Sequence, residues 1–306
     1  MVKHYSIKTK QAGSRVLILA GVHGNEYEPM LVAMQLLEEL PDLLLKGSVT
    51  IVPVANEAAY IHGNRCASDE VDLARVCPGN EEGNATERIA HVVSELIKET
   101  DYLIDMHTGG LLYDIYPMVG YMLHTDPVVL EKQQQMAKSS GLPLIWGTDS
   151  RPEGRTLSVA RDQNIPAIYF EYGGGTGFRE QVVETYKEAC IRVLAALDLF
   201  ERKLPVQERY SYWVEDERPD SGHLQIKMPA PADGIFTAVV KTGDYIRKGQ
   251  LFGEIVDPLS QTTYNVFAEE DGLVFLLRTS VYAKVGEALG GILPIELFSK
   301  KVIKEI

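Results

Sequence analysis

Residues 15–26, RVLILAGVHGNE, decide the fold, because here a continuous apolar run ends in a glycine-containing turn. An apolar run without polar alternation predicts a strand that is buried on both faces of a sheet. Residues 26–40 follow with the periodicity of a helix. A buried strand that leads through a short turn into a helix is the repeating unit of an α/β fold.

The same alternation continues through the first two-thirds of the chain. Further strands are predicted at residues 49–54, 102–107 and 167–171. A helix is predicted behind the capping box of Asn84 and Glu87, and a long helix follows the last of these strands. Residues 1–205 are therefore predicted to form one α/β domain, with helices on both faces of its sheet.

The pattern changes after residue 205. Residues 206–224 are polar and irregular and predict a linker, and residues 225–306 carry short β-type segments between glycine turns, which predict a small all-β domain. The run at 228–255 resembles the half-barrel of biotinyl and lipoyl carrier domains, so a barrel-sandwich-like fold is expected. The following turn at 257–262 contains no lysine, and we expect no attached cofactor there. A lid or an oligomerisation domain is the expected role.

Composition limits the classes of function. The chain has 306 residues, 30 Lys and Arg against 43 Asp and Glu, and a formal charge of -13, which disfavours nucleic-acid binding. No stretch approaches the roughly 18 apolar residues of a membrane span, and the N-terminus lacks the apolar core of a signal peptide. Cys66, Cys77 and Cys190 form neither a disulfide framework nor a metal-binding spacing. We expect a cytoplasmic protein without a nucleic-acid or membrane partner.

Four residues suggest metal chemistry. His23 and Glu26 lie three residues apart at the strand-to-helix turn, so both side chains share one side of the turn. Both are good zinc ligands, and His107, at the end of a strand where open sheets build their sites, supplies a third. Glu171 ends a later strand before three glycines and is placed to act as a general base. Alone, each of these pieces also fits a purely structural role.

Together these residues resemble the succinylglutamate desuccinylase/aspartoacylase family, a branch of the zinc carboxypeptidase superfamily, over residues 15–200. The resemblance implies a zinc-carboxypeptidase-like mixed sheet and one zinc ion per chain, held by His23, Glu26 and His107. It also implies that Glu171 activates water and then protonates the departing amine.

A second motif of that family matches residues 72–75. By resemblance, Asp72 orients His23, Arg75 binds a substrate carboxylate, and Arg65 stabilises the oxyanion. The chain departs from the family pattern at Ala74, where asparagine is usual, and at Cys77, where phenylalanine is expected. Losing a hydrogen bond to a charged group is worth about 1.5–3 kcal/mol, which is enough to change the preferred substrate.

The resemblance implies hydrolysis of the amide bond of a small N-acyl amino acid, by a chain that could form a homo-oligomer. Three alternatives remain open: a metallocarboxypeptidase that acts on peptides, an N-acetyl-diamino-acid deacetylase, and a catalytically silent binding protein of the same fold. The same ligands also accept cobalt or manganese.

Five further residues are candidates for substrate contacts. Tyr113 and Tyr116 follow His107 in a predicted loop and could line the pocket or form a surface rim. Arg151, Arg155 and Arg161 precede the strand of Glu171, and any of them could meet a second carboxylate or remain solvated. The sequence does not choose between these readings.

Overall fold

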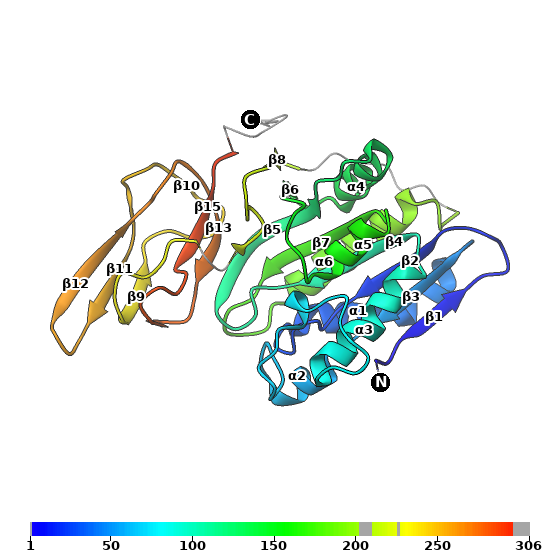
Figure 1. The fold of residues 1–306 in the computed structure, drawn as a ribbon. Helices are drawn as coiled ribbons and strands as arrows, with labels where there is room; N and C mark the ends of the chain where they lie inside the picture. Colours follow the sequence, from blue (N-terminus) through cyan, green and yellow to red (C-terminus); the bar gives the residue numbers. More distant parts are fainter. Residues whose placement is uncertain (1, 202–209, 225–226, 296–306) are drawn as a thin grey trace.

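The computed structural model describes residues 2–201, 210–224 and 227–295. Figure 1 shows a central sheet with helices around it and, on the left of the view, a group of C-terminal strands. The helices are α1 (Tyr27–Leu43), α2 (Glu57–His62), η1 (Leu73–Arg75, a 3-10 helix), α3 (Ala85–Lys98), α4 (Pro127–Ser140), α5 (Thr156–Asp162) and α6 (Glu180–Ala196). The strands are β1 (Tyr5–Lys8), β2 (Arg15–Leu19), β3 (Ser48–Val52), β4 (Tyr102–His107), β5 (Tyr113–Met122), β6 (Leu144–Thr148), β7 (Ala167–Gly173), β8 (Tyr212–Glu215), β9 (Gly234–Ala238), β10 (Tyr245–Ile246), β11 (Leu251–Asp257), β12 (Thr262–Phe267), β13 (Gly272–Arg278), β14 (Tyr282–Ala283) and β15 (Gly290–Leu293).

The large sheet is mixed. Its main path runs β1-β3-β2-β4-β7-β5-β13-β10, with β6, β8 and β15 attached beside it. The four strands β3, β2, β4 and β7 are parallel, and β5 runs antiparallel to β7. This confirms the predicted mixed α/β fold, and it brings the carboxyl ends of β2, β4 and β7 to one edge of the sheet.

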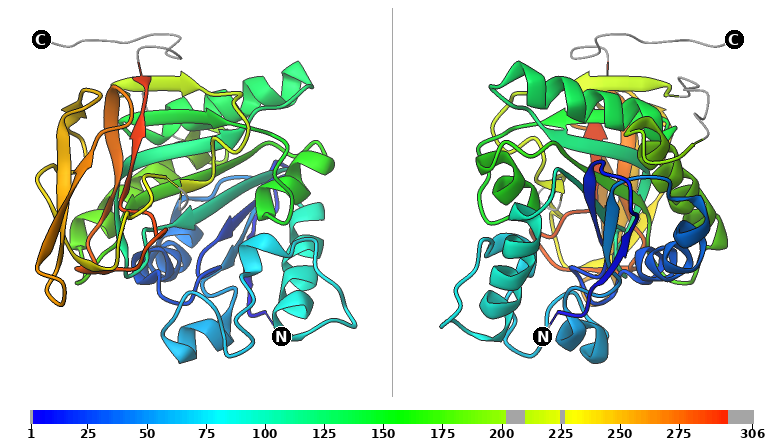
Figure 2. Two further views of the ribbon diagram at one scale, coloured as in Figure 1. Left: turned by 60° about the vertical axis from the view of Figure 1, so that its left-hand side comes forward. Right: turned by 90° about the vertical axis from the view of Figure 1, so that its right-hand side faces the viewer.

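Helices cover both faces of the sheet, as predicted (Figure 2). On one face α6 packs against α1 and α4, over an apolar cluster that includes Ile18, Ile104 and Phe170. On the other face α3 packs against α5, over a second cluster that includes Leu17 and Leu103. Alternate residues of the same strands enter the two clusters, which explains the unbroken apolar runs in the sequence.

Strand β5 corrects the prediction of a loop after His107. The strand pairs with β7 on one side and with both β6 and β13 on the other. It contains Pro117, and the pairing with β7 shifts register between Ile115 and Met118. Proline is tolerated in a sheet at such an irregularity because the ladder there does not need its missing N–H group.

The C-terminal strands divide between two sheets. Strands β9, β11, β12 and β14 form a four-stranded antiparallel sheet, whereas β10, β13 and β15 belong to the large sheet. The two groups share an apolar cluster that includes Phe252, Ile255 and Val274. Among the described residues the strands therefore pack as two facing layers and do not close into a barrel.

Strand β8 lies inside the segment 206–224, where the sequence predicts a linker, and it pairs with β6. Residues 206–209 of that segment lie outside the described residues. Strands β11 and β12 form the predicted hairpin around residues 257–262. In the described part of the chain, no helix combines the length and the apolar character that a membrane crossing requires.

Candidate metal centre

The turn after β2 holds His23 and Glu26 together because Gly24 lies against α2. A Cβ atom at Gly24 would lie 2.0 Å from the carbonyl carbon of Ala59, so only glycine lets α2 pack this closely. Glu26 is then the residue that precedes the first turn of α1. Both side chains are buried as a result.

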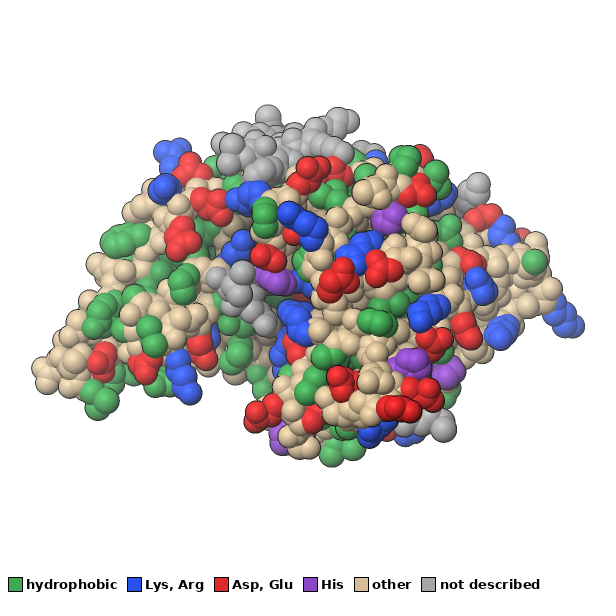
Figure 3. Space-filling model, viewed as in Figure 1, with side chains coloured by type: hydrophobic (Ala, Val, Ile, Leu, Met, Phe, Trp, Pro, Cys, Tyr) green, Lys and Arg blue, Asp and Glu red, His purple; other side chains and the backbone are tan. Residues whose placement is uncertain are grey.

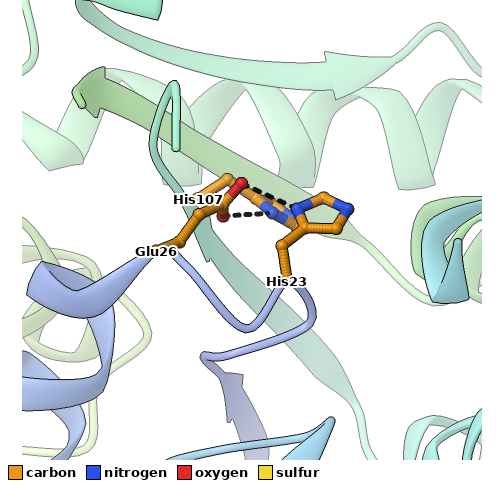
Figure 4. A group of neighbouring side chains, drawn as sticks. All are labelled: His23, Glu26 and His107. Atoms are coloured by element: carbon orange, nitrogen blue, oxygen red, sulfur yellow. Dashed lines mark hydrogen bonds and ion pairs between the residues drawn. The ribbon is translucent and has the colours of Figure 1, made fainter. Parts of the chain in front are cut away.

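The structure brings His23, Glu26 and His107 into one buried group (Figure 4). The Nδ1 atom of His23 lies 2.7 Å from Glu26 Oε1, and the Nδ1 atom of His107 lies 3.1 Å from Glu26 Oε2. One ligand atom from each residue lies within 4.8 Å of the others, so the three side chains could hold a metal ion. Two imidazoles and one carboxylate form the ligand set of a catalytic metal with open positions.

Each imidazole uses its second nitrogen to contact another carboxylate. His23 Nε2 lies 3.2 Å from Asp72 Oδ1, and His107 Nε2 lies 3.1 Å from Asp105 Oδ2. The hydroxyl of Thr156, at the start of α5, donates to the same Asp105 oxygen. A carboxylate behind a ligating histidine fixes the ring and its tautomer, leaving Nδ1 free for a metal ion.

Asp105→Asn is expected to lower the affinity for zinc about 10- to 100-fold, because it weakens the support behind His107. Competition against a chromophoric chelator measures that affinity directly. Asp101→Asn is the matched control, since Asp101 lies just before the same strand and pairs with Arg15 at its far end. Equal affinities in the two variants would show that Asp105 does not support the site.

Burial and neighbouring charges set the ionisation of the group. Burial favours a neutral Glu26, but the imidazoles of His23 and His107 outweigh it and hold the pKa of Glu26 well below its usual range. Burial also opposes a charge on His107, yet Asp105 and Glu26 raise the pKa of His107 well above its usual value. Without an ion, a protonated imidazole thus compensates the carboxylates, and a bound cation would take over that role.

Glu171 lies beside this group on β7, directly across the ladder from His107 on β4. Burial raises the pKa of Glu171 to about 8. Its Oε2 atom is buried and accepts no hydrogen bond from the described residues. A carboxyl group in this state is poised to exchange a proton with whatever occupies the pocket.

The four residues line one pocket. Figure 3 shows a hollow between the helical part and the C-terminal strands, with basic side chains and a histidine at its edge. The C-terminal part of the chain supplies some of its wall, through Gly222, Leu224 and Leu276. Tyr113 also lines the pocket, whereas Tyr116 packs against Gly243.

The arginines separate into two groups. Arg65, Arg75 and Arg155 line the pocket. Arg151 instead pairs with Asp149, and Arg161 pairs with Glu153 and Asp162.

Arg65 lies between two carboxylates of the site, those of Asp72 and Glu26. Its Nε donates to Asp72 Oδ2 at 3.0 Å, and its Nη1 lies 3.9 Å from Glu26 Oε1. Arg75 donates to its neighbour's carbonyl, Ala74 O, at 2.8 Å. Arg155 has one long hydrogen bond, from Nη1 to Gly222 O at 3.4 Å, and its buried Nε and Nη2 atoms find no acceptor among the described residues.

Several residues that line the pocket are not among those predicted from the sequence. Asp105 could have been found, since it lies two residues before His107 and alternate residues of a strand share one face. Tyr169 could have been found in the same way from Glu171. Leu276 could not, because only the pairing of β13 with β5 brings that strand to the site, and Leu224 could not, because it lies in the segment where the sequence predicts a linker.

The chain is similar to proteins of known family. The profile of the Succinylglutamate desuccinylase/Aspartoacylase catalytic domain matches residues 12–197. A curated relative, the N-alpha-acetyl-L-2,4-diaminobutyric acid deacetylase of Halomonas elongata, is 26% identical over 284 residues, which cover 90% of this chain and 81% of the relative.

Solved structures share the fold. A succinylglutamate desuccinylase/aspartoacylase from Rhodobacter sphaeroides has a TM-score of 0.84 at 22% identity, over 94% of this chain and 88% of that one. The product-bound ectoine utilization protein EutE (DoeB) of Ruegeria pomeroyi has a TM-score of 0.84 at 22% identity, over 95% and 88%. The profile match spans more than half of the sequence, including every candidate ligand and Glu171. The predicted resemblance is therefore confirmed, and this chain belongs to the succinylglutamate desuccinylase/aspartoacylase family.

Proposed function

We propose that this protein is a zinc-dependent hydrolase that cleaves the amide bond of a small N-acyl amino acid. One observation carries the proposal: a buried group of two histidines and a glutamate lies beside Glu171 in a pocket lined by three arginines. Family membership supports the same class of reaction.

Zinc fits the residues that are present. His23 and His107 direct Nδ1 toward Glu26 and are held from behind by Asp72 and Asp105, as ligating imidazoles require. These three side chains would hold one ion and leave positions open. Zinc in such a site supplies Lewis acidity, which polarises the scissile carbonyl and makes water a better proton donor.

Glu171 is the proposed general base and acid. A bound cation would favour the ionised form of Glu171. Its Oε2 atom, which accepts no hydrogen bond from the described residues, could then take the proton of the attacking water and return it to the departing nitrogen. Arg65 is the proposed oxyanion partner, because its guanidinium lies beside Glu26, at the edge of the metal group. A cation there stabilises charge that develops on the carbonyl oxygen in the transition state.

Arg75 is proposed to bind the α-carboxylate of the amino acid, since a guanidinium matches a carboxylate in bidentate geometry. Arg155 adds a second positive charge in the same pocket, with two donor atoms that find no acceptor in the part of the chain that the structure describes. A buried guanidinium with free donors favours an anionic ligand. We therefore propose a substrate whose side chain carries a second anionic group.

An N-acetyl-diamino-acid deacetylase is the second candidate, because the similar Halomonas elongata protein bears that description. Its substrate would bring a cationic side chain to Arg155, and like charges repel strongly in a pocket of low polarity. A metallocarboxypeptidase ranks lower, since Leu224 and Leu276 help to wall the pocket and leave less room for a peptide. A catalytically silent binding protein ranks lowest, because His23, Glu26, His107 and Glu171 are all present and line the same pocket.

A panel assay tests the proposal. The zinc-loaded protein is incubated with N-acetylaspartate, N-acetylglutamate, Nα-acetyl-2,4-diaminobutyrate and C-terminal dipeptides, and the free amine is followed by mass spectrometry. We expect zinc-dependent cleavage of the anionic N-acyl amino acids. Faster cleavage of the diaminobutyrate derivative would make the protein a diamino-acid deacetylase, cleavage of dipeptides alone would make it a carboxypeptidase, and no cleavage of any of them would contradict the proposal.

A further inference from the structure

We infer that Tyr169 determines the length of the amino-acid side chain that the pocket accepts. The inference rests on the proposed function, because it assigns Tyr169 to the subsite for that side chain. Tyr169 is neither a proposed metal ligand nor the proposed general base, yet its side chain lines the same pocket.

The strand geometry directs Tyr169 into the site. Tyr169 lies two residues before Glu171 on β7, so both side chains leave the same face of the sheet. Its neighbour across the ladder is Gly120 of β5. A Cβ atom at Gly120 would lie 2.1 Å from Cζ of Tyr169 and 2.3 Å from its hydroxyl oxygen. The tyrosine ring therefore lies flat across the bare backbone of β5.

The hydroxyl end of the ring reaches the next strand. Burial raises the pKa of Tyr169, and Glu171 adds to that effect, whereas Arg155 and a hydrogen bond with Thr148 of β6 oppose it. Thr148 is itself buried, with its hydroxyl 3.3 Å from the carbonyl oxygen of Tyr121. Burial thus keeps the phenol neutral, and the ring extends from β7 over Gly120 of β5 toward Thr148 of β6.

The ring lies in the pocket near both Glu171 and Arg155, because the charges of both residues act on its hydroxyl. These three residues line the same pocket, together with Met122 and Leu157. A substrate side chain directed toward Arg155 would share this volume with the ring, so the ring should leave room for a short side chain and exclude longer ones.

The length limit is tested with one series of substrates. N-acetylaspartate, N-acetylglutamate and N-acetyl-2-aminoadipate differ by one methylene at each step and keep the same charges. We expect the wild-type protein to have its highest kcat/KM with the shortest member. Tyr169→Ala should raise kcat/KM for N-acetylglutamate relative to N-acetylaspartate about 10- to 200-fold, which is the usual effect of one methylene in a pocket, and it should raise the ratio for N-acetyl-2-aminoadipate further.

Tyr169→Phe is the matched control, because it keeps the ring on Gly120 and removes only the hydroxyl. Its length preference should stay that of the wild-type protein. Zinc content and melting temperature are measured for both variants, so that the ratio is compared between folded, metal-loaded proteins. If Tyr169→Ala keeps the wild-type ratio of kcat/KM values, the inference about Tyr169 is wrong, while the proposed function still stands. Absence of turnover on the whole series by the wild-type protein would contradict the proposed function, and the inference would fail with it.

Discussion

Glu171→Gln is expected to lower kcat about 10²- to 10⁴-fold, because glutamine keeps the shape of the side chain but cannot accept the proton of water. Zinc content should stay at the wild-type level, since Glu171 is not among the three proposed ligands. Steady-state kinetics and elemental analysis on the same preparation measure the two quantities. Retained turnover would contradict the role of Glu171 as general base, and loss of zinc would instead make it part of the metal site.

The stability of the same variant gives an independent readout. Burial raises the pKa of Glu171 to about 8, so above the unfolded carboxyl pKa and in the absence of metal, folding must pay to keep this group protonated or to bury its charge. Glutamine removes that cost, and the metal-free variant should melt no lower than the metal-free wild-type protein at neutral pH.

Glu215→Gln is the matched control for both measurements. Glu215 is another partly buried carboxylate on a strand. It accepts hydrogen bonds from Tyr121 and Gln134 and is not among the residues that line the described pocket. The change from carboxylate to amide is the same, and kcat should remain at the wild-type level.

Removal of the metal is expected to have the second large effect. A chelator should reduce turnover to background, and stoichiometric zinc should restore it, because Arg65 without the ion would polarise the carbonyl less and would not make water a better proton donor. The protein should stay folded without the ion, since His23, Glu26 and His107 then bond to one another. Zinc at 100 to 1,000 times its dissociation constant should add about 2.7–4.1 kcal/mol of stability, which is visible as a higher melting temperature.

His107→Ala separates this effect from damage by the chelator. The variant should contain little zinc and should gain no turnover when zinc is added. Cobalt and manganese are tested in the same way, because the ligand set accepts them with different affinity. Full turnover of a wild-type sample that elemental analysis shows to be free of metal would contradict the metal mechanism.

Local patterns explain which parts of the fold could be predicted. Strands β2, β4 and β7 are largely apolar because both of their faces are covered, and short apolar segments of this kind can be recognised in the sequence. Strand β5 is difficult to recognise in the sequence because it contains Pro117 and Gly120, which are usual signs of a loop. Both have a reason in the tertiary structure that the local sequence does not contain: a shift of register at Pro117 and the ring of Tyr169 on Gly120.

The residues of the site also fall into those that the sequence predicts and those whose position depends on the tertiary structure. His23 and Glu26 are close in sequence, and His107 and Glu171 end neighbouring strands, so the general rules for α/β sheets place them together. Arg155 lines the pocket because it immediately precedes the first turn of α5, whereas Arg151 lies before the helix and Arg161 lies within it. The sequence does not indicate at which residue this helix begins, so it could not select one of the three arginines.

The pairing of β5 with β13 has a consequence for the synthesis of the protein. Thr279 Oγ1 donates to Leu112 O across 167 residues, so the partner of this edge leaves the ribosome long after the metal-binding residues. Until then, the first part of β5 is an uncovered strand edge, to which another unfinished chain can pair. A nascent chain must therefore shield this edge for the time needed to translate most of the molecule. Chains that stop at residue 205 carry every proposed metal ligand and Glu171, yet are expected to aggregate.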